Sequence, residues 1–411
     1  MWSAGCGVAR RGCFGAERRK SSADDAGGAD SANPPPPGLR HCAGGFLLIL
    51  LNNVSSTSSG SPGSGGRPIG FGIFGLGMIA EFHAQAIAGL KGARLVGVAS
   101  RTAAKTQAFA AKHGGVFAGS TIEELVARPD LDVVCITTSS GAHLEPALAA
   151  IRAGKHVVIE KPIEITPDRV DAILRAAAEA KVRVAPIFQG RFGEGARTAK
   201  AAIDAGRLGR LVLASAYVKW HRTADYYTGT RGQLAVDGGG ALMVQAIHAV
   251  DLLQWFAGLP TEVFAWSARR VHTGIEGEDT VSGSLRYADG ALGVIEATTA
   301  PWPGWQRRIE ICGENGSIVL ENDHLVRWEF RMPQPEDEAI RATRIDGALG
   351  SGASRPDAIS FVGHQRQLQD LVDALQAGRA PSLDGAEGRK AVALVRAVYD
   401  SAASGRVVRV G

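Results

Sequence analysis

Residues 68–90 read PIGFGIFGLGMIAEFHAQAIAGL, and this stretch decides the fold of the chain. Its first part, residues 69–74, is short and apolar, which predicts a buried strand, and its last part has the apolar spacing of a helix. Between the two, Gly75, Gly77 and Ala80 form a G-x-G-x-x-A pattern. A helix that starts directly after such a turn presents free N–H groups and the positive end of its dipole. The stretch therefore predicts the phosphate-binding turn of a dinucleotide-binding domain.

The same alternation of apolar strands and helices continues to about residue 188. Further strands are predicted at residues 93–100, 131–138, 156–160 and 182–188. Because these strands are apolar throughout and helical segments separate them, they predict a parallel sheet covered on both faces. The fold class is therefore α/β, with an N-terminal Rossmann domain over residues 67–188.

A second domain is predicted over residues 189–411. Its strands are longer and have fewer helices between them, and Asp289-Gly290 between two alternating runs indicates a hairpin. We expect an α+β domain with a large, mostly antiparallel sheet. Residues 1–66 are rich in Gly, Ser, Pro and Ala, a composition that cannot build a core, so they are predicted to be a disordered extension.

The composition excludes several classes of function. The formal net charge of the 411-residue chain is only +4, and outside residues 10–20 its basic residues are scattered, so no nucleic-acid partner is expected. No apolar run reaches the about 20 residues that a membrane-spanning helix needs. The five cysteines show no metal-ligand spacing, so we expect no metal site and a reducing compartment, the cytoplasm.

The end of the second predicted strand bears on the choice of cofactor. A site that prefers NAD(H) usually has Asp or Glu there to bind the ribose 2′-hydroxyl group. This chain has Ser100 and Arg101, and a hydroxyl group beside a guanidinium suits a 2′-phosphate. We therefore expect NAD(P)(H) and favour NADP(H). The alternative interpretation is that Arg101 simply faces solvent at a helix start.

Two further motifs carry side chains that can move protons. The sequence HVVIEKP places Glu160 and Lys161 at the carboxyl end of a predicted parallel strand, where ligands lie in such sheets. The sequence VDGGGALMVQAIHAVD, residues 236–251, carries His248 on an apolar helix. Taken singly, a solvated lysine and a buried core histidine are the simpler interpretations. Their occurrence together with a dinucleotide-binding turn favours one shared site.

Together, the G-x-G-x-x-A turn, AGKHVVIEKP and DGGGALMVQAIHAVDLLQW resemble the Gfo/Idh/MocA family of oxidoreductases. The resemblance extends from about residue 69 to the C-terminus. It implies a nicotinamide cofactor and the oxidation or reduction of a carbon that bears a hydroxyl group in sugars, inositols and related compounds. It also implies that the second domain binds substrate and that its open sheet face forms homodimers or homotetramers.

The resemblance assigns roles to individual positions. Lys161 and His248 match the family's proton-transfer residues and are the candidate catalytic groups. The candidate cofactor-binding residues are Gly75, Gly77, Met78, Ile79, Ala80, Ser100, Arg101, Thr138, Ser139, Ser140, His143, Glu160 and Lys161.

The chain departs from the family pattern at Val244. Many members have an aspartate there, four residues before the histidine, so that both side chains share one helix face. Val244 cannot form a hydrogen bond with His248 through its side chain. Gln245 is a partial substitute, and Asp237 and Asp251 are the other candidate partners.

Residues 216–240, which lead to the His248 helix, combine cations with aromatic rings. Rings can stack on a sugar and guanidinium groups can bind a carboxylate or phosphate, so we expect a carbohydrate-like substrate that can be anionic. The segment also resembles a subgroup that includes nucleotide-sugar uronate dehydrogenases. A solvated loop anchored by a few rings is the alternative. The candidate substrate-binding residues are Arg191, Lys219, His221, Tyr226, Tyr227, Arg231, Gln245 and His248.

Three functions stay open at this point. The first is an NAD(P)-dependent oxidoreductase in which Lys161 and His248 handle the hydroxyl proton. The second is a glycoside hydrolase that recycles NAD, which would release a sugar without net consumption of cofactor. The third is a catalytically silent dinucleotide-binding regulator, an option kept open because Val244 replaces a carboxylate.

Overall fold

The computed structural model describes residues 67–343 and 360–411, so the predicted N-terminal extension lies outside the described residues. In this part of the chain the first sheet has six parallel strands in the order β3-β2-β1-β4-β5-β6, which confirms the predicted Rossmann sheet. The strand order reverses between β1 and β4, where sheets of this type bind ligands. The strands are β1 (Ile69–Phe74), β2 (Ala93–Ala99), β3 (Phe117–Gly119), β4 (Val133–Ile136), β5 (His156–Ile159) and β6 (Val184–Pro186).

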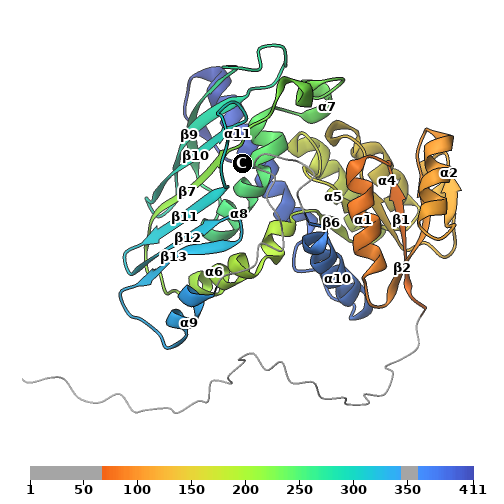
Figure 1. Cartoon of the computed structure of the whole chain (residues 1–411), viewed down its shortest axis with the longest axis horizontal. Coiled ribbons are helices and arrows are strands. Elements are labelled where there is room, and N and C mark those ends of the chain that lie inside the picture. Colours follow the sequence, from red (N-terminus) through yellow and green to blue (C-terminus); the bar gives the residue numbers. More distant parts are fainter. Residues whose placement is uncertain (1–66, 344–359) are drawn as a thin grey trace, which may run out of the picture. The chain divides into compact units, whose positions relative to one another are not determined.

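Helices cover this sheet on both faces, as its apolar strands require (Figure 1). Two of the helices start where local sequence predicts. The Thr121 side chain accepts a hydrogen bond from the Glu124 N–H group at 3.2 Å, and Pro167 begins a helix directly after its cap, Thr166. The helices are α1 (Met78–Ala88), α2 (Ala103–Lys112), α3 (Ile122–Val126), α4 (Leu144–Arg152) and α5 (Pro167–Ala180).

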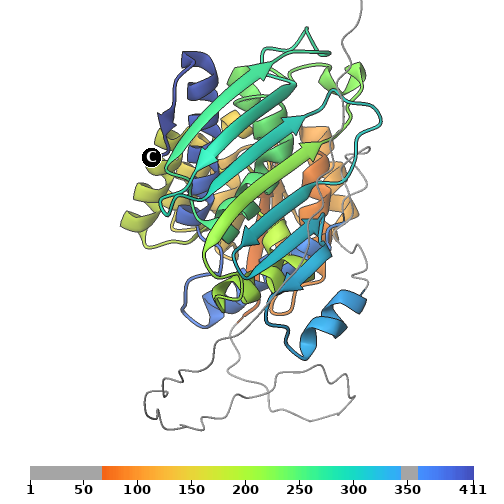
Figure 2. The same ribbon diagram turned by 90° about the vertical axis from the view of Figure 1, so that its left-hand side faces the viewer.

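The second sheet has eight strands within the described residues, in the order β13-β12-β11-β7-β10-β9-β8-β14. Among the described strands of this sheet only β7 and β10 pair in parallel, so the prediction of a mostly antiparallel sheet is confirmed, as is the hairpin at Asp289-Gly290. Figure 2 shows the broad face of this sheet with the helices behind it. The strands are β7 (Leu211–Lys219), β8 (Glu262–Ala268), β9 (Thr280–Arg286), β10 (Leu292–Thr298), β11 (Arg308–Gly313), β12 (Gly316–Glu321), β13 (His324–Phe330) and β14 (Val408–Arg409).

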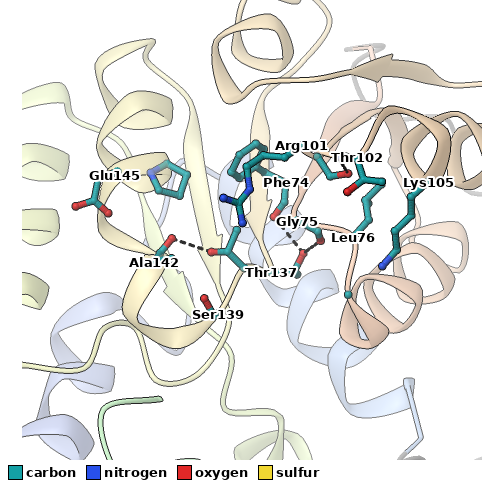
Figure 3. Close-up of a pocket in the computed structure, with 14 residues that line it drawn as sticks. Phe74, Gly75, Leu76, Arg101, Thr102, Lys105, Thr137, Ser139, Ala142 and Glu145 are labelled. Carbon is teal, nitrogen blue, oxygen red and sulfur yellow. Dashed lines mark hydrogen bonds between the residues drawn. The ribbon is translucent and has the colours of Figure 1, made fainter. Parts of the chain in front are cut away.

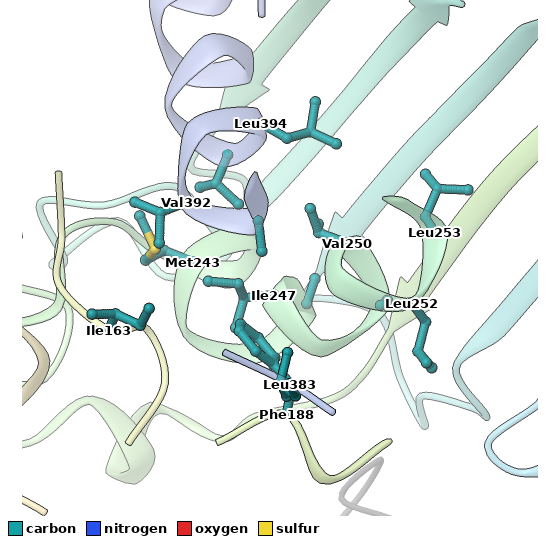
Figure 4. Packing of buried hydrophobic residues seen from close by; sticks show 14 of the residues in the cluster. Ile163, Phe188, Met243, Ile247, Val250, Leu252, Leu253, Leu383, Val392 and Leu394 are labelled. Atoms are coloured by element: carbon teal, nitrogen blue, oxygen red, sulfur yellow. The ribbon is translucent and has the colours of Figure 1, made fainter. Parts of the chain in front are cut away.

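The helices of the second half pack mainly on the face of the sheet that is turned toward the first domain (Figure 1). Figure 4 shows the apolar packing of α8 against α11, with Ile247 and Val250 facing Val392 and Leu394. The helices of this half are α6 (Glu194–Asp204), α7 (Leu234–Asp237), α8 (Ile247–Ala257), α9 (Glu336–Ala342), α10 (Val362–Gln376) and α11 (Gly385–Ser404), and of these α6, α8, α9 and α11 contact strands of the second sheet.

The predicted helix that carries His248 is not uniform. Its first part, Ala241–Ala246, is a π-helix, and the α-helix begins only at Ile247. The Glu278 carboxylate caps this start, accepting hydrogen bonds from the N–H groups of Gly240 and Leu242 at 2.9 and 2.8 Å. A Cβ atom at Gly240 would clash with the Glu278 backbone, which explains a glycine at this position.

Helix α10 comes late in the sequence but belongs to the first core. It packs against α1, and its residues Leu368, Leu371 and Val372 share a buried cluster with Phe71 and Ile73 of β1. Part of the chain beyond the predicted boundary at residue 188 therefore packs with the first sheet.

We predict that Leu371→Ala destabilises the protein by about 2–5 kcal/mol, because it removes a fully buried side chain and leaves a cavity between α10 and α1. The apparent free energy of unfolding from urea denaturation measures this effect. Leu234→Ala is the matched control, since Leu234 is 48% exposed and its loss should change stability by less than about 1 kcal/mol. Equal effects of the two substitutions would contradict the packing of α10 in the first core.

Candidate active site

A cavity of about 710 Å³ lies at the carboxyl ends of β1, β2 and β4, next to the start of α1 (Figure 3). Figure 3 shows Lys105 at one end of this cavity and Glu145 at the other. Its position at the reversal of strand order is the one expected for a dinucleotide. The predicted cofactor residues that line it are Gly75, Gly77, Ser100, Arg101, Thr138 and Ser139.

The turn at the start of α1 fits a pyrophosphate. Gly75 has a φ of 96°, and a Cβ atom there would clash with the backbone of Thr138, so only glycine suits the position. A Cβ atom at Gly77, in contrast, would meet nothing within 4 Å, so the space above the helix start is open. Ala80, in the first turn of α1, is fully buried. The residues present therefore fit the phosphates of a nicotinamide dinucleotide.

A second cavity, of about 230 Å³, joins elements of both sheets, and Thr138 lines it as well as the first cavity. Its lining brings Lys161, at the end of β5, together with His248 of α8, although 86 residues separate them in the chain. The other predicted site residues in this lining are Met78, Ile79, Glu160, Tyr226 and Gln245.

Lys161 contacts the helical segment that carries Val244, the residue found where many family members have an aspartate. Its Nζ atom donates a hydrogen bond to the backbone carbonyl oxygen of Val244 at 2.9 Å. This carbonyl lies in the π-helical turn, and turns of this kind are frequent at functional sites. The Val244 backbone thus positions the ammonium group, while its side chain lines the cavity beside His248.

Burial shifts both candidate catalytic groups toward their neutral forms. Burial lowers the pKa of Lys161 against the opposing effect of the Glu160 and Asp237 carboxylates. Burial, followed by the nearby charge of Lys161, holds the pKa of His248 well below its usual range. A neutral amine and a neutral imidazole can each accept a proton, which is what a hydroxyl group gives up on oxidation.

Glu160 stays ionised inside the protein because two histidines donate to it. Burial alone would raise the pKa of Glu160, but hydrogen bonds from His364 and His83 outweigh that effect and place it well below the usual value. The Nε2 atoms of His83 and His364 lie 2.8 and 3.3 Å from Glu160 Oε1. One histidine comes from α1 and the other from α10, so the carboxylate joins both helices to the site.

The same three residues could in principle hold a metal ion, since their ligand atoms lie within 4.8 Å of one another. A metal-bound imidazole usually donates its second N–H group to an acceptor. Among the described residues, neither the Nδ1 atom of His83 nor that of His364 has a hydrogen-bond partner. Hydrogen bonding to the ionised carboxylate of Glu160 therefore accounts for this cluster better than metal binding does.

Several predicted cofactor and substrate residues lie outside both linings. His143 is buried and its ring nitrogens face the carbonyl oxygens of Thr138 and Pro162, so it connects the loops around the site. Lys219 pairs with Glu296, and the Tyr227 hydroxyl group contacts Thr299. The predicted residues that line neither cavity are Ala80, Ser140, His143, Arg191, Lys219, His221, Tyr227 and Arg231.

Arg191 has a structural position that its predicted role did not anticipate. It is buried, and its guanidinium binds the Asp251 carboxylate at 2.7 and 2.8 Å and Glu387 at 3.2 Å. Arg191 therefore links the connection after β6 to α8 and α11 rather than facing the cavity. Asp251, one candidate partner of His248, is held by this ion pair. The Gln245 side chain bonds to Arg222 and Tyr226.

The structure adds residues that the sequence analysis did not select. Lys105, in the first turn of α2, lines the first cavity together with Arg101. Trp220 and Arg222 belong to the segment expected to bind substrate. Nothing in the local sequence marks the others, because they come from separate elements. The added residues in the second lining are Phe82, Gln189, Trp220, Arg222 and His364.

No helix in the described ranges combines the length and apolar character needed to cross a bilayer.

Comparison with known proteins gives consistent matches along the chain. Residues 69–188 match the family described as "Oxidoreductase family, NAD-binding Rossmann fold", and residues 196–319 match the GFO/IDH/MocA C-terminal domain. The inositol 2-dehydrogenase of Rhizobium meliloti (strain 1021) is 28% identical over 350 residues, which cover 83% of this chain and 98% of the relative.

Two solved structures extend the comparison. The WlbA dehydrogenase from Bordetella pertussis, in complex with NADH and UDP-GlcNAcA, is 31% identical with a TM-score of 0.75, over 84% of this chain and 99% of that one. A levoglucosan dehydrogenase in complex with NADH and levoglucosan is 25% identical with a TM-score of 0.71, over 84% and 100%. With both domains matched in order and the dinucleotide turn in place, the chain belongs to the GFO/IDH/MocA family of oxidoreductases.

Proposed function

We propose that the protein is an NAD(P)-dependent oxidoreductase that interconverts a hydroxyl-bearing carbon and a carbonyl group in a sugar, sugar acid or cyclic polyol. The observation that carries this proposal is the shared lining of the second cavity, where Lys161 and His248 meet beside the dinucleotide cavity. The named activities of the relatives, on inositol and levoglucosan, support the same class of substrate.

In this mechanism the chain's residues handle the proton. A bound nicotinamide ring would supply the hydride acceptor in oxidation and the hydride donor in reduction. Lys161 Nζ, whose pKa burial lowers, accepts the hydroxyl proton in its neutral form as the carbonyl group forms, and the Val244 carbonyl oxygen orients it. His248 supplies a second neutral acceptor in the same lining. Glu160 keeps a negative charge next to the resulting ammonium group.

For the cofactor, we favour NADP(H). Arg101, Lys105 and Ser100 all line the dinucleotide cavity. Two cations attract the negative charge of the 2′-phosphate of NADP(H), and a hydroxyl group can donate a hydrogen bond to it. The two solved relatives were determined in complex with NADH, so a preference for NADP(H) would distinguish this chain from them.

The protein is further proposed to be a homodimer or homotetramer in the cytoplasm. Apolar side chains point outward from several strands of the second sheet, among them Trp266 at 65% and Leu292 at 52% exposed. An exposed apolar face of this kind is typical of a protein–protein contact. A reducing location agrees with the free thiols of Cys135 and Cys312 in the described residues.

Replacing Lys161 tests the mechanism. Lys161→Ala should lower kcat by about 10²–10⁴-fold, because it removes the group that takes the proton.

In the wild type, the rate of oxidation should rise with pH through a pKa below the usual lysine value, since the neutral amine is the active form and burial lowers that pKa. Reduction should fall over the same range, because it needs the protonated amine. Initial rates of NAD(P)H absorbance change against pH measure both.

The control for this experiment is Lys112→Ala, which removes a 61%-exposed lysine paired with Glu81 and should leave the rate and its pH profile unchanged. Normal turnover by Lys161→Ala, or an unchanged pH profile in that variant, would remove Lys161 from the mechanism.

Replacing both cations tests the cofactor preference. The double substitution Arg101→Ala with Lys105→Ala should raise KM for NADP⁺ by about tenfold or more, since charged hydrogen bonds contribute about 1.5–3 kcal/mol. KM for NAD⁺ should change by less than about twofold, because NAD⁺ has no 2′-phosphate. Steady-state kinetics with each cofactor gives the two values. A parallel rise in both would show that these residues do not read the 2′-phosphate.

Light scattering after gel filtration tests the oligomeric state. The wild type should have the mass of two or four chains, and Trp266→Glu should shift the mass toward one chain by placing a charge in the apolar contact. Met332→Glu, at a residue 77% exposed just beyond β13, serves as control and should keep the wild-type mass. A monomeric wild type would refute the proposed assembly.

A further inference from the structure

Within residues 67–343 and 360–411, Glu160 and Lys161 form no ion pair, although they are neighbours in the chain and line the same cavity. Lys161 Nζ donates to the Val244 carbonyl oxygen at 2.9 Å instead. An opposite charge in direct contact favours the charged form of a lysine. A closed pair with Glu160 would therefore remove the neutral amine that accepts the substrate proton.

Both oxygen atoms of the Glu160 carboxylate accept hydrogen bonds. Oε1 lies 2.8 Å from His83 Nε2 and 3.3 Å from His364 Nε2, and Oε2 accepts the backbone N–H group of Lys161 at 3.2 Å. Against the effect of burial, the hydrogen bonds from His364 and His83 hold the pKa of Glu160 well below its usual range. Because an ionised carboxylate can only accept, both histidine Nε2 atoms carry the hydrogen. These contacts hold the carboxylate away from Lys161 Nζ.

The contact with Glu160 is the one hydrogen bond that His364 makes in the described ranges. His364 is 1% exposed, its Nδ1 atom has no partner there, and its ring lies 5.3 Å from that of His83. A buried polar group that is not fully paired costs free energy, so an apolar side chain would suit the packing of α10 on α1 better. Interaction with Glu160 therefore explains a second buried imidazole better than packing does.

His364 lies outside both segments that match the family. Those segments are residues 69–188 and 196–319, and α10 begins after them, at Val362. His364 reaches Glu160 because α10 packs on α1, and it lines the second cavity together with Lys161 and His248. The two family matches thus assign no role to this histidine, although it lies in the site.

We infer that His364 is a positioning residue of the reaction: with His83 it holds Glu160 at Oε1 and so keeps the carboxylate from closing an ion pair with Lys161. This inference rests on the proposed function and deepens it. Through this restraint the negative charge stays near Lys161 without trapping the amine in its protonated form. His364 acts through Glu160 and transfers no proton in this role.

Other charged and titratable side chains face the cluster from the surrounding elements. They are Asp237 at the end of α7, Arg222 after β7, His248 of α8 and Cys135 of β4. None of these four hydrogen-bonds to the Glu160 carboxylate in the described part of the chain. Arg191 of η2 (Gln189–Phe192), which packs on α10, is already paired with Asp251. Substitution of His364 leaves all of them in place, so a resulting change in the pKa of Lys161 reports the state of Glu160.

The pKa of Lys161 tests the inference without turnover. The full-length protein is labelled with acetic anhydride over about pH 6–11, a range that spans the usual lysine value. Mass spectrometry of the peptide that contains Lys161 gives the modified fraction, with the exposed Lys112 as internal reference. His364→Leu should raise the pKa of Lys161 by about one pH unit or more, because the released carboxylate can pair with the ammonium group. His364→Gln, whose amide can still donate, should keep the wild-type value.

Turnover gives a second readout, with the oxidation of myo-inositol and levoglucosan by NAD⁺ or NADP⁺ as probe reactions. At pH values below the pKa of Lys161, kcat of His364→Leu should be about tenfold lower than that of the wild type, since a rise of one pH unit in the pKa leaves about a tenth of the neutral amine. The rate should recover at higher pH. KM should change by less than about twofold, because His364 acts on the proton-accepting group rather than on binding.

Two further substitutions separate this role from a structural one. Glu160→Gln removes the charge that opposes the effect of burial, so it should lower the pKa of Lys161, and adding His364→Leu to it should cause no further change. Gln365→Leu is the matched control on α10. It removes another hydrogen bond to α1, from Gln365 Nε2 to the Gly89 carbonyl oxygen at 2.9 Å, and should leave the pKa of Lys161 unchanged.

The inference is overturned if His364→Leu leaves the pKa of Lys161 unchanged or lowers it, if Gln365→Leu raises it equally, or if the rise persists beside Glu160→Gln. Should His364→Leu fail to fold, His364→Asn replaces it, because the asparagine amide ends near the Nδ1 position and does not reach Glu160. His364→Asn should then raise the pKa of Lys161, and an unchanged value would equally refute the restraint.

The labelling result is independent of the proposed function. A raised pKa of Lys161 in His364→Leu, without reduction of either cofactor by any polyol, supports the restraint on Glu160 and counts against the oxidoreductase function. Normal turnover with an unchanged pKa of Lys161 in that variant leaves the function in place and overturns the inference.

Discussion

The site depends on one contact between distant parts of the chain, the hydrogen bond from Lys161 Nζ to the Val244 carbonyl oxygen. It joins the carboxyl end of β5 to the π-helical turn that precedes α8. A carbonyl oxygen accepts a hydrogen bond whether the lysine is charged or neutral, whereas an aspartate at position 244 would favour the charged form. The backbone contact thus positions the amine while burial keeps its pKa low.

Hydrogen bonds to Glu278 hold the start of the π-helix, and the Glu278 backbone leaves no room for a side chain at Gly240. Glu278 accepts N–H groups from Gly240 and Leu242, and the Tyr399 hydroxyl group donates to the same carboxylate at 3.0 Å. Burial raises the pKa of Glu278, and these hydrogen bonds oppose that shift. A larger residue at Gly240 would push the helix away from this anchor and carry the Val244 carbonyl oxygen with it.

Buried charge in this protein serves two separate purposes. The Arg191–Asp251 pair is closed on itself and ties the second domain together, so it contributes little to the cavity. Glu160 is different, because its Oε1 atom accepts hydrogen bonds from His83 and His364, and its carboxylate acts on the adjacent Lys161 without a closed ion pair. Such a carboxylate can respond when Lys161 gains or loses a proton. This difference explains why a buried arginine and a buried glutamate, both candidates from the sequence, lie in different environments.

The sequence by itself determined the Rossmann sheet and the mostly antiparallel second sheet, since both rest on local periodicity. It also determined the dinucleotide turn, which rests on its glycines, and the shared site of Lys161 and His248, which rests on motifs that a family resemblance connects. It did not determine the π-helical turn, the placement of Arg191, or the contribution of Gln189 and His364. Those depend on which side chains meet across elements far apart in the chain, as when α10 returns to α1 and carries His364 to Glu160. Local sequence patterns do not predict these contacts, because the packing and pairing of buried polar groups depend on the complete tertiary structure.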